Sequence, residues 1–245
     1  SMADFWRLQR FSSLGSTSDL CKEMAAQGAP AGTAITALEQ TAGRGRQGRF
    51  FASPKGFGLY LSVLLRPQVP PEQAAQLTAW TAVTLRAVLE GVCGVTPDIK
   101  WPNDLLLGGK KLCGILTEFV PPDGVIIGMG INLNQTAEDF GDLSPIATSL
   151  GLETGSAPDL EEVLQGVLRG LREMAEGFPQ DRDRVLAAYR AGCVTLRQPV
   201  FLHRPTERVS AFAEDVDEGF RLRVVCADGS RETVSSGEVS LRHRL

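Results

Sequence analysis

The sequence predicts an α+β body followed by a small β-barrel, and three observations lead to this prediction. Segments with helical and with β periodicity are mixed irregularly up to about residue 192. From Val194 onward, the chain reads only as short strands and turns. The chain has 245 residues, of which 43% are apolar, so it can bury a full core in one large domain or two unequal ones. We therefore expect a body over residues 2–193 and a barrel over residues 194–245.

The first part of the body is expected to hold a helix and two strands. Residues 16–28 read as a helix because Ser and Thr side chains can cap its start and Gly28-Ala29-Pro30 can end it. Residues 33–40 are a β-prone run, and residues 57–67 are an apolar strand that stops at Pro67.

The second part of the body is expected to begin and end with helices. Residues 71–92 form a long helix because Leu77, Thr81, Leu85 and Val88 fall on one face. A meander of strands follows, with "DIKW", "DLLL", "KLCGILTEF" and "GVIIGMGINLN" separated by turn residues. Helical periodicity returns over residues 159–178 and 181–191. In the tail, "PVFL", "RVSAFAEDV", "FRLRVV", "RETVS" and "EVSLR" read as strands.

Composition excludes several classes of function. A net charge of −4 argues against general nucleic-acid binding, which relies on a broadly basic surface. Five scattered cysteines without a C-x-x-C pair indicate reduced thiols, and two histidines are too few for a histidine zinc cluster or a Ser-His-Asp triad. With neither a signal peptide nor an apolar run of bilayer length, we expect a cytoplasmic protein that does not bind a membrane.

The stretch "GRGRQGRF", residues 43–50, concentrates three arginines and three glycines. If the segment is extended, Arg44 and Arg46 share a face, because side chains alternate along an extended chain. The glycines allow close approach of a ligand to the backbone, and guanidinium groups suit carboxylate and phosphate oxygens. The stretch therefore predicts binding of an anion larger than one carboxylate. A solvated Arg-Gly turn and an RGG-type RNA contact remain alternatives.

Residues 100–104, "KWPND", form a second candidate motif. Pro102 favours an extended Trp101, so Lys100 and Asp104 are expected at a strand break. There, a lysine, an amide and a carboxylate could bind the ribose and phosphates of a nucleotide, with the carboxylate reaching Mg²⁺. The alternative is a β-turn with a surface ion pair, which contributes little energetically.

Two further motifs lie on neighbouring strands. In "KKLCGIL", Lys111 opens a strand and Gly114 leaves room where a side chain would project. In "GMGINLN", Gly128 and Gly130 interrupt an apolar strand, and Asn132 could read an adenine edge with its donor and acceptor. The alternatives are a solvated lysine and a strand that ends in a glycine bulge.

Five motifs occur together in this order and spacing: "STS", "EQTAGRGRQGR", "KWPND", "KKLCGIL" and "GMGINLN". Taken jointly, they closely resemble the motifs of the biotin–protein ligases, also called biotin–[acetyl-CoA-carboxylase] ligases. The resemblance runs from about Phe11 to Arg242. It implies a mixed-sheet catalytic domain related to that of class II aminoacyl-tRNA synthetases, with a C-terminal SH3-like barrel. It also implies two half-reactions: biotin and ATP give biotinoyl-5′-AMP, and an acceptor lysine then displaces AMP.

The resemblance also implies roles for individual residues. Those expected to bind biotin are Ser16, Thr17, Ser18, Gln40, Gly43, Arg44, Gly45, Arg46, Lys111 and Gly114. Those expected to bind ATP are Arg46, Arg49, Phe51, Lys100, Asn103, Asp104, Lys111, Ile131 and Asn132, with Phe51 covering adenine and Asp104 reaching Mg²⁺. Those expected to act in catalysis are Arg44, Arg46, Arg49 and Lys111. The loop 43–53 is expected to fold over its ligand and to exclude water from the anhydride.

The implied partner is a biotin carboxyl carrier domain of acetyl-CoA carboxylase or of another biotin-dependent carboxylase. We expect a monofunctional enzyme that does not bind DNA, because the catalytic pattern begins within the first fifteen residues. Both a monomer and a homodimer are compatible with the sequence. A lipoate–protein ligase is the nearest rival, since it shares the fold and the adenylate strategy. A non-catalytic nucleotide- or RNA-binding module that uses the same arginines is the rival from another class.

Overall fold

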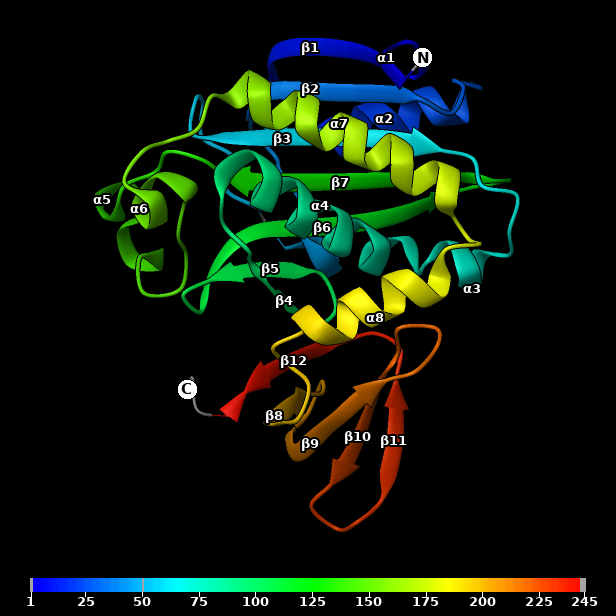
Figure 1. Ribbon diagram of the computed structural model, residues 1–245, viewed down its shortest axis with the longest axis vertical. Helices are drawn as coiled ribbons and strands as arrows, with labels where there is room; N and C mark the ends of the chain where they lie inside the picture. The colour runs from blue at the N-terminus through cyan, green and yellow to red at the C-terminus, as the bar shows by residue number, and fades with distance from the viewer. Residues whose placement is uncertain (1, 50, 243–245) are drawn as a thin grey trace.

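The computed structural model describes residues 2–49 and 51–242 and contains two β-sheets (Figure 1). The larger sheet has seven strands in the order β1-β2-β3-β7-β6-β5-β4. Only the β1–β2 pair is parallel among these described strands. The strands are β1 (Arg7–Leu14), β2 (Thr33–Gln40), β3 (Gly58–Leu65), β4 (Asp98–Lys100), β5 (Asp104–Leu107), β6 (Lys110–Val120) and β7 (Gly124–Asn132).

Helices cover both faces of the larger sheet. α4 (Leu77–Cys93) and α7 (Leu160–Gly177) lie across one face, and α2 (Thr17–Ala26) lies behind the sheet in Figure 1. The other helices are α1 (Met2–Phe5), α3 (Pro71–Ala74), α5 (Ala137–Phe140), α6 (Leu150–Thr154) and α8 (Arg182–Gly192), with 3₁₀ turns η1 (Arg46–Gly48) and η2 (Gly141–Leu143).

The core follows from the two-residue period of the strands. Along β3, Leu61 and Val63 pack into the large apolar cluster beneath α4 and α7, whereas Leu64 joins a smaller cluster beneath α2. Ile35 of β2 joins the same smaller cluster. Because both faces are covered, every residue of β3 is buried and the strand reads as a continuous apolar run rather than an alternating one.

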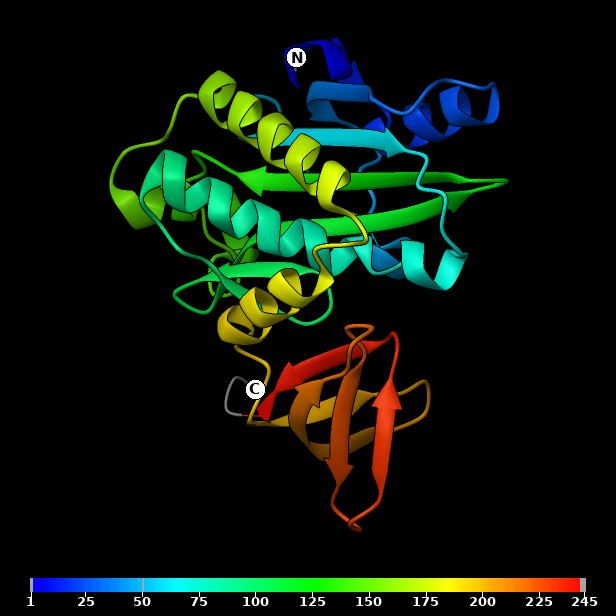
Figure 2. The ribbon, with the colours of Figure 1, turned by 45° about the vertical axis from the view of Figure 1, so that its right-hand side comes forward.

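The second sheet has five antiparallel strands in the order β11-β10-β9-β8-β12 and lies beside α8 (Figure 2). Its strands are β8 (Gln198–His203), β9 (Arg208–Val216), β10 (Leu222–Cys226), β11 (Arg231–Val234) and β12 (Glu238–Leu241). Trp101 Nε1 donates to Phe220 O at 2.9 Å, and the Tyr189 ring packs edge-on against the Phe220 ring, so aromatic contacts join the sheets. The proposed domain boundary at 193/194 falls between α8 and β8, and the division itself stays a prediction.

The helices and strands that the sequence predicts are present, but the helix expected over residues 71–92 is divided into α3 and α4 at Ala75–Gln76. The strand β1, the short helices α1, α5 and α6, and the 3₁₀ turns were not expected. On α4, Leu77, Thr81 and Leu85 are buried, but Leu89 replaces the half-buried Val88 as the last core position. Within the described residues, none of the helices has the combination of length and apolarity that a membrane crossing requires.

Candidate functional site

A cavity of about 200 Å³ lies where the larger sheet, the N-terminus of α2, the arginine loop and β12 meet. The arginine loop is defined here as residues 43–49. Residues of five sequence motifs line the cavity together with one strand of the second sheet. The lining residues are Ser16, Thr17, Ser18, Gln40, Arg44, Gly45, Arg46, Arg49, Phe51, Lys100, Trp101, Asn103, Asp104, Lys111, Gly114, Ile115, Leu116, Gly128, Met129, Gly130, Glu238 and Val239.

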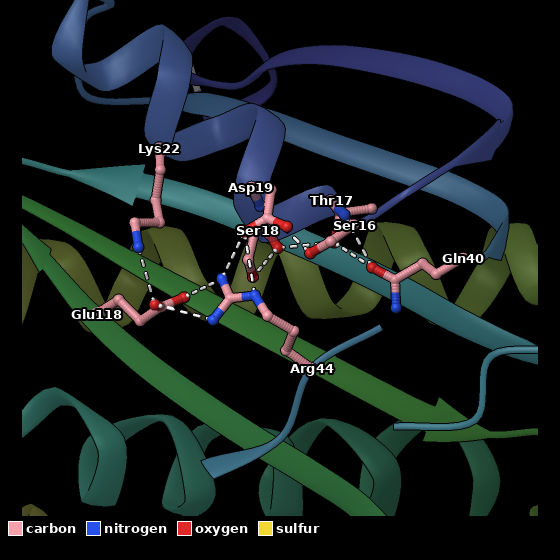
Figure 3. A network of polar contacts seen from close by, with 9 residues as sticks. Ser16, Thr17, Ser18, Asp19, Lys22, Gln40, Arg44 and Glu118 are labelled. Atoms are coloured by element: carbon pink, nitrogen blue, oxygen red, sulfur yellow. Dashed lines mark hydrogen bonds and ion pairs between the residues drawn. The ribbon is translucent and has the colours of Figure 1, made fainter. Parts of the chain in front are cut away.

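One end of the cavity is a chain of hydroxyl and amide groups. Ser16 caps α2 by accepting from the Asp19 N–H at 3.2 Å, so the next two side chains are presented at the helix start. Thr17 Oγ1 donates to Gln40 Oε1 at 3.0 Å (Figure 3). Ser62 Oγ lies 2.8 Å from both Thr17 Oγ1 and Ser18 Oγ.

The single proton of each hydroxyl fixes the direction of this chain. Because Thr17 donates to Gln40, Ser62 donates to Thr17 and Ser18 donates to Ser62. The Ser18 oxygen therefore keeps acceptor capacity toward the cavity. Gln40 Nε2 donates one hydrogen to Ser53 Oγ at 2.8 Å and retains a second. This end of the cavity can both accept hydrogen bonds from a ligand and donate them to it.

Gly128 and Gly130 make room for this site on β7. A Cβ atom at Gly128 would lie 2.3 Å from Ser18 Oγ, and one at Gly130 would lie 2.4 Å from the Phe51 ring. Both glycines pair in register with β3 and β6, so the glycine-bulge alternative is wrong. Their lack of a side chain serves close approach instead.

The arginine loop does not present Arg44 and Arg46 on one face, because it is not extended throughout. Residues 46–48 form η1, and the two guanidinium groups bind different partners. Arg44 donates to Glu118 on β6 and to Asp19 on α2. Arg46 donates to Gly237 O at 2.8 Å, which belongs to the second sheet's final turn.

Arg49 also contacts the second sheet, through an ion pair with Glu238 at 2.5 Å. Hydrogen bonding from Arg49 holds the pKa of Glu238 below its ordinary value. Burial lowers the pKa of Arg46, although Asp104 and Glu238 oppose this effect. An arginine keeps its charge throughout the physiological range, so the loop is cationic. In this structure, each of its three arginines has a partner within the protein.

The "KWPND" segment forms the turn between β4 and β5, so Lys100 and Asp104 lie at a strand break as expected. The two residues are also paired in register across the hairpin. Asn103 is buried and donates to Ile115 O at 2.8 Å. Asp104 Oδ1 lies 3.3 Å from Lys111 Nζ, which in turn lies 5.5 Å from the centroid of the Phe51 ring. Cations, a carboxylate and an aromatic ring thus meet at this end of the cavity.

Three of the expected site residues are not among those that line the cavity in the described chain. Gly43 is buried beneath the loop, where a Cβ atom would lie 2.5 Å from Phe51 O. Ile131 is fully buried in the core. Asn132 donates to Thr148 O at 3.0 Å and accepts from Gln135 Nε2 at 3.0 Å. Their roles stay predictions, as do the roles of the lining residues.

The polar side chains of Ser62, Glu118 and Glu238 contact residues of the site but were not singled out from the sequence. Ser62 is the one serine in a strand of mostly apolar residues, and that contrast is the signal that could have identified it. Glu118 and Glu238 lie in separate strands that are distant from the arginine loop in the sequence. Each is a single acidic residue that belongs to no local sequence pattern. Among the described residues, no cluster of three or more His, Cys, Asp or Glu side chains could hold a metal ion.

Sequence comparison relates this chain to a known family. Residues 11–132 match the Biotin/lipoate A/B protein ligase family. The chain is 35% identical to a biotin–[acetyl-CoA-carboxylase] ligase of Mycobacterium tuberculosis, over 96% of this chain and 89% of that protein. It is 44% identical to the bifunctional ligase/repressor BirA of Bacillus spizizenii over 63% of this chain, and it spans about half, 49%, of that relative's length.

Structural comparison gives the same relationship. A biotin protein ligase from Aquifex aeolicus, solved with biotin and ATP, superposes with a TM-score of 0.84 at 31% identity. That alignment covers 96% of this chain and 98% of the other. The expectation of a mixed-sheet body with a β-rich C-terminal part is therefore confirmed.

Proposed function

Because the chain belongs to the biotin protein ligases within the biotin/lipoate A/B protein ligase family, we propose that it activates biotin with ATP and transfers the biotinoyl group to a lysine of a biotin carboxyl carrier domain. The observation that carries this proposal is the composition of the cavity. One end offers neutral hydroxyl and amide groups, and the other is cationic. A ligand with a polar neutral head and an anionic tail, next to a polyphosphate, matches both ends.

The hydroxyl end suits the ureido ring of biotin. The ureido N–H groups need acceptors, and the Ser16 and Ser18 oxygens can supply them. The ureido oxygen needs a donor, and Gln40 Nε2 retains one hydrogen for this purpose. In this proposal Gly45 brings the loop backbone close to the valerate tail, and Gly114 leaves room beside it. Gly43 does not line the cavity and is retained as a biotin-binding position on the family resemblance alone.

The cationic end suits the chemistry of the first half-reaction. A biotin carboxylate oxygen attacks the α-phosphorus of ATP, the bond to the β-phosphate oxygen breaks, and pyrophosphate leaves. Both reactants are anions, so the main task is to offset their repulsion and the charge that develops on phosphorus. Arg46, Arg49 and Lys111 line the cavity and supply positive charge for this purpose. The carboxylate is already ionised at neutral pH, so this step needs no general base.

In the second half-reaction, the neutral amine of an acceptor lysine attacks the carboxyl carbon of biotinoyl-5′-AMP. An amide bond forms, the acyl–phosphate bond breaks, and AMP leaves. The loop's contribution is to keep water away from the anhydride until the amine arrives.

Nucleotide recognition is assigned to the "KWPND" hairpin and its neighbours. Lys100, Asn103 and Asp104 lie together at the cavity, and the Phe51 ring lies against Gly114 and Gly130 near it. We assign adenine contact to Phe51, and we retain Ile131 and Asn132 as nucleotide-facing positions on the strength of the family resemblance alone.

A magnesium ion fits the donor set only in company with a nucleotide. Mg²⁺ is commonly held by one or two carboxylates together with substrate phosphates. Asp104 is one such carboxylate, and it lies beside Lys111 at the cavity. Bound there, Mg²⁺ would neutralise phosphate charge.

One experiment tests the proposed function directly. The protein is incubated with ATP, biotin and a purified carrier domain, and the carrier is weighed by mass spectrometry. A mass gain of one biotinoyl group on the carrier is expected, and a carrier whose acceptor lysine is replaced by arginine is the control. If ATP–pyrophosphate exchange depends on lipoate rather than on biotin, the result favours a lipoate ligase. If the protein binds RNA without biotin-dependent release of AMP, the result favours a nucleic-acid-binding module.

A further inference from the structure

We propose that Glu118 is a positioning residue that anchors the arginine loop through Arg44, and that the Arg44 side chain is therefore a fixed support of the loop rather than a ligand of the substrate. This inference rests on the proposed function, because it assigns a task to residues at the same site. It separates Arg44 from Arg46 and Arg49, which the sequence placed together.

The anchor is a compact set of four charged side chains (Figure 3). Glu118 accepts two hydrogen bonds from Arg44, from Nη2 to Oε1 at 2.8 Å and from Nη1 to Oε2 at 3.1 Å. Asp19 Oδ1 accepts from Arg44 Nε at 3.0 Å and lies 2.7 Å from Arg44 Nη2. Lys22 Nζ lies 3.1 Å from Glu118 Oε2. Two cations and two anions balance one another, so no net charge is left to attract an anion.

These contacts engage all three nitrogen atoms of the Arg44 guanidinium group. A substrate phosphate that recruited Arg44 would have to break a bidentate pair and a second carboxylate contact, and bidentate pairs are the strong ones. The Arg44 side chain is only 28% exposed and that of Glu118 only 19%. Solvent therefore screens this pair less than it screens the 58% exposed side chain of Arg49.

Arg46 and Arg49 are held in a different way. Arg46 has one neutral carbonyl partner, and Arg49 has an exposed ion pair. Exposed pairs contribute little, so an incoming phosphate can replace these contacts. The loop thus has one arginine that is held fast and two that are free to exchange partners.

The position of the anchor explains why the loop needs it. Arg44 lies between Gly43 and Gly45, and glycine-flanked backbone is costly to order. Asp19 and Lys22 belong to α2, the helix whose start carries Ser16, Thr17 and Ser18. The anchor therefore fixes the loop relative to the hydroxyl end of the cavity, so a single ligand can reach both.

Glu118 is ionised when it performs this task. Burial by itself would raise the pKa of Glu118, but hydrogen bonds from Arg44 and Lys22 outweigh burial and hold that pKa below its ordinary value. Replacement by glutamine keeps the size of the side chain and removes the charge, so Glu118→Gln tests the ion pair rather than the packing.

The test uses biotin-dependent ATP–pyrophosphate exchange with the full chain. We expect Glu118→Gln to raise KM for biotin about tenfold, as loss of a charge-assisted pair would, while kcat changes less than about twofold. The matched control is Asp123→Asn, which neutralises a carboxylate partner of Arg66 at 2.7 Å that does not line the cavity. The control should leave KM and kcat unchanged.

A double-mutant cycle separates anchoring from direct binding. If Arg44 acts through Glu118, adding Arg44→Gln to Glu118→Gln should raise KM less than about twofold further. If the two single effects instead multiply, Arg44 binds substrate directly and the inference is wrong. It is equally wrong if Glu118→Gln behaves as the Asp123→Asn control does.

If Glu118→Gln lowers the thermal midpoint more than the control does, a change in its KM could reflect a loss of stability. A second variant, Asp19→Asn, then tests the anchor. Asp19→Asn acts on the same guanidinium group from a more exposed side chain, which is 55% exposed. We expect it to raise KM for biotin about threefold, as a weaker contact would. An unchanged KM in a folded Asp19→Asn protein would overturn the anchor. Absence of exchange by the parent chain would instead overturn the proposed function, and this inference with it.

Discussion

The variants Gly128→Ala and Gly130→Ala should impair the binding of different substrates. The two residues lie two positions apart on β7 and so share a face of the sheet. A Cβ atom at Gly128 would lie 2.3 Å from Ser18 Oγ, whereas one at Gly130 would lie 2.4 Å from the Phe51 ring. Because the two new methyl groups meet different ends of the cavity, the pair of variants tests how the site is divided.

The magnitude for Gly128→Ala follows from the hydroxyl chain. Ordinary van der Waals contact begins at 3.4 Å, so Ser18 Oγ would have to move by about 1 Å. That displacement breaks its hydrogen bond to Ser62, whose loss at a buried site costs about 1–3 kcal/mol. Since each 1.4 kcal/mol is a factor of about ten, KM for biotin should rise about fivefold to a hundredfold. Overpacking should also lower the free energy of unfolding by about 1–3 kcal/mol.

Gly130→Ala should behave differently, because Phe51 belongs to a loop and its ring can move aside. We expect KM for ATP to rise several-fold with KM for biotin little changed. Steady-state exchange assays with each substrate varied in turn measure both constants, and chemical denaturation reports the free energy of unfolding. If Gly128→Ala left KM for biotin unchanged, or if both variants raised the same constant equally, the assignment of the two ends would be refuted.

Four further outcomes are expected. Arg46→Gly should weaken retention of the adenylate, so mass spectrometry should find biotin on bystander lysines; finding none would contradict this role. Tryptic cleavage within residues 44–49 should slow when biotin and ATP are added together, and equal rates would argue against ligand-induced ordering. Gly91→Ala should raise the free energy of unfolding by about 0.5–1 kcal/mol, because alanine favours a helix interior more than glycine does. A Cβ atom at this position would meet nothing within 4 Å, so it would cause no clash. A lower unfolding midpoint in urea would contradict this expectation. The hydrogen bond from Arg10 lowers the pKa of Glu161 to about 2. The contribution of this pair to the free energy of unfolding is therefore present above about pH 4.5 and is lost as the pH falls toward 2. The difference in free energy of unfolding between the parent and Glu161→Gln, at most about 1 kcal/mol, should vanish over that range.

The fold was largely predictable because most elements carry strong periodicity. The amphipathic stripe of α7 is an example, since Leu164, Val167 and Leu171 all prove to be buried. The strand β1 was not predictable, because it is a polar edge strand whose residues are mostly exposed and lack regular alternation. An edge strand with one partner leaves little trace in a local pattern.

The candidate site was predictable where one short segment carries its residues. The arginine loop and the "KWPND" hairpin are of this kind, and their side chains do line one cavity. The partners of the arginines were not predictable, because Glu118 and Glu238 are brought to the loop only by sheet pairing and by packing of the second sheet. A lone glutamate in a strand carries no signal of which distant cation it will meet.

The contact between Arg46 and Gly237 has a consequence for the newborn polypeptide. The two residues are separated by 191 positions, so the loop is synthesised long before its support in the second sheet emerges from the ribosome. Until that support arrives, the nascent chain lacks one wall of the cavity, to which Glu238 and Val239 contribute. Under the proposed function, this order would delay completion of the cavity until the second sheet has folded.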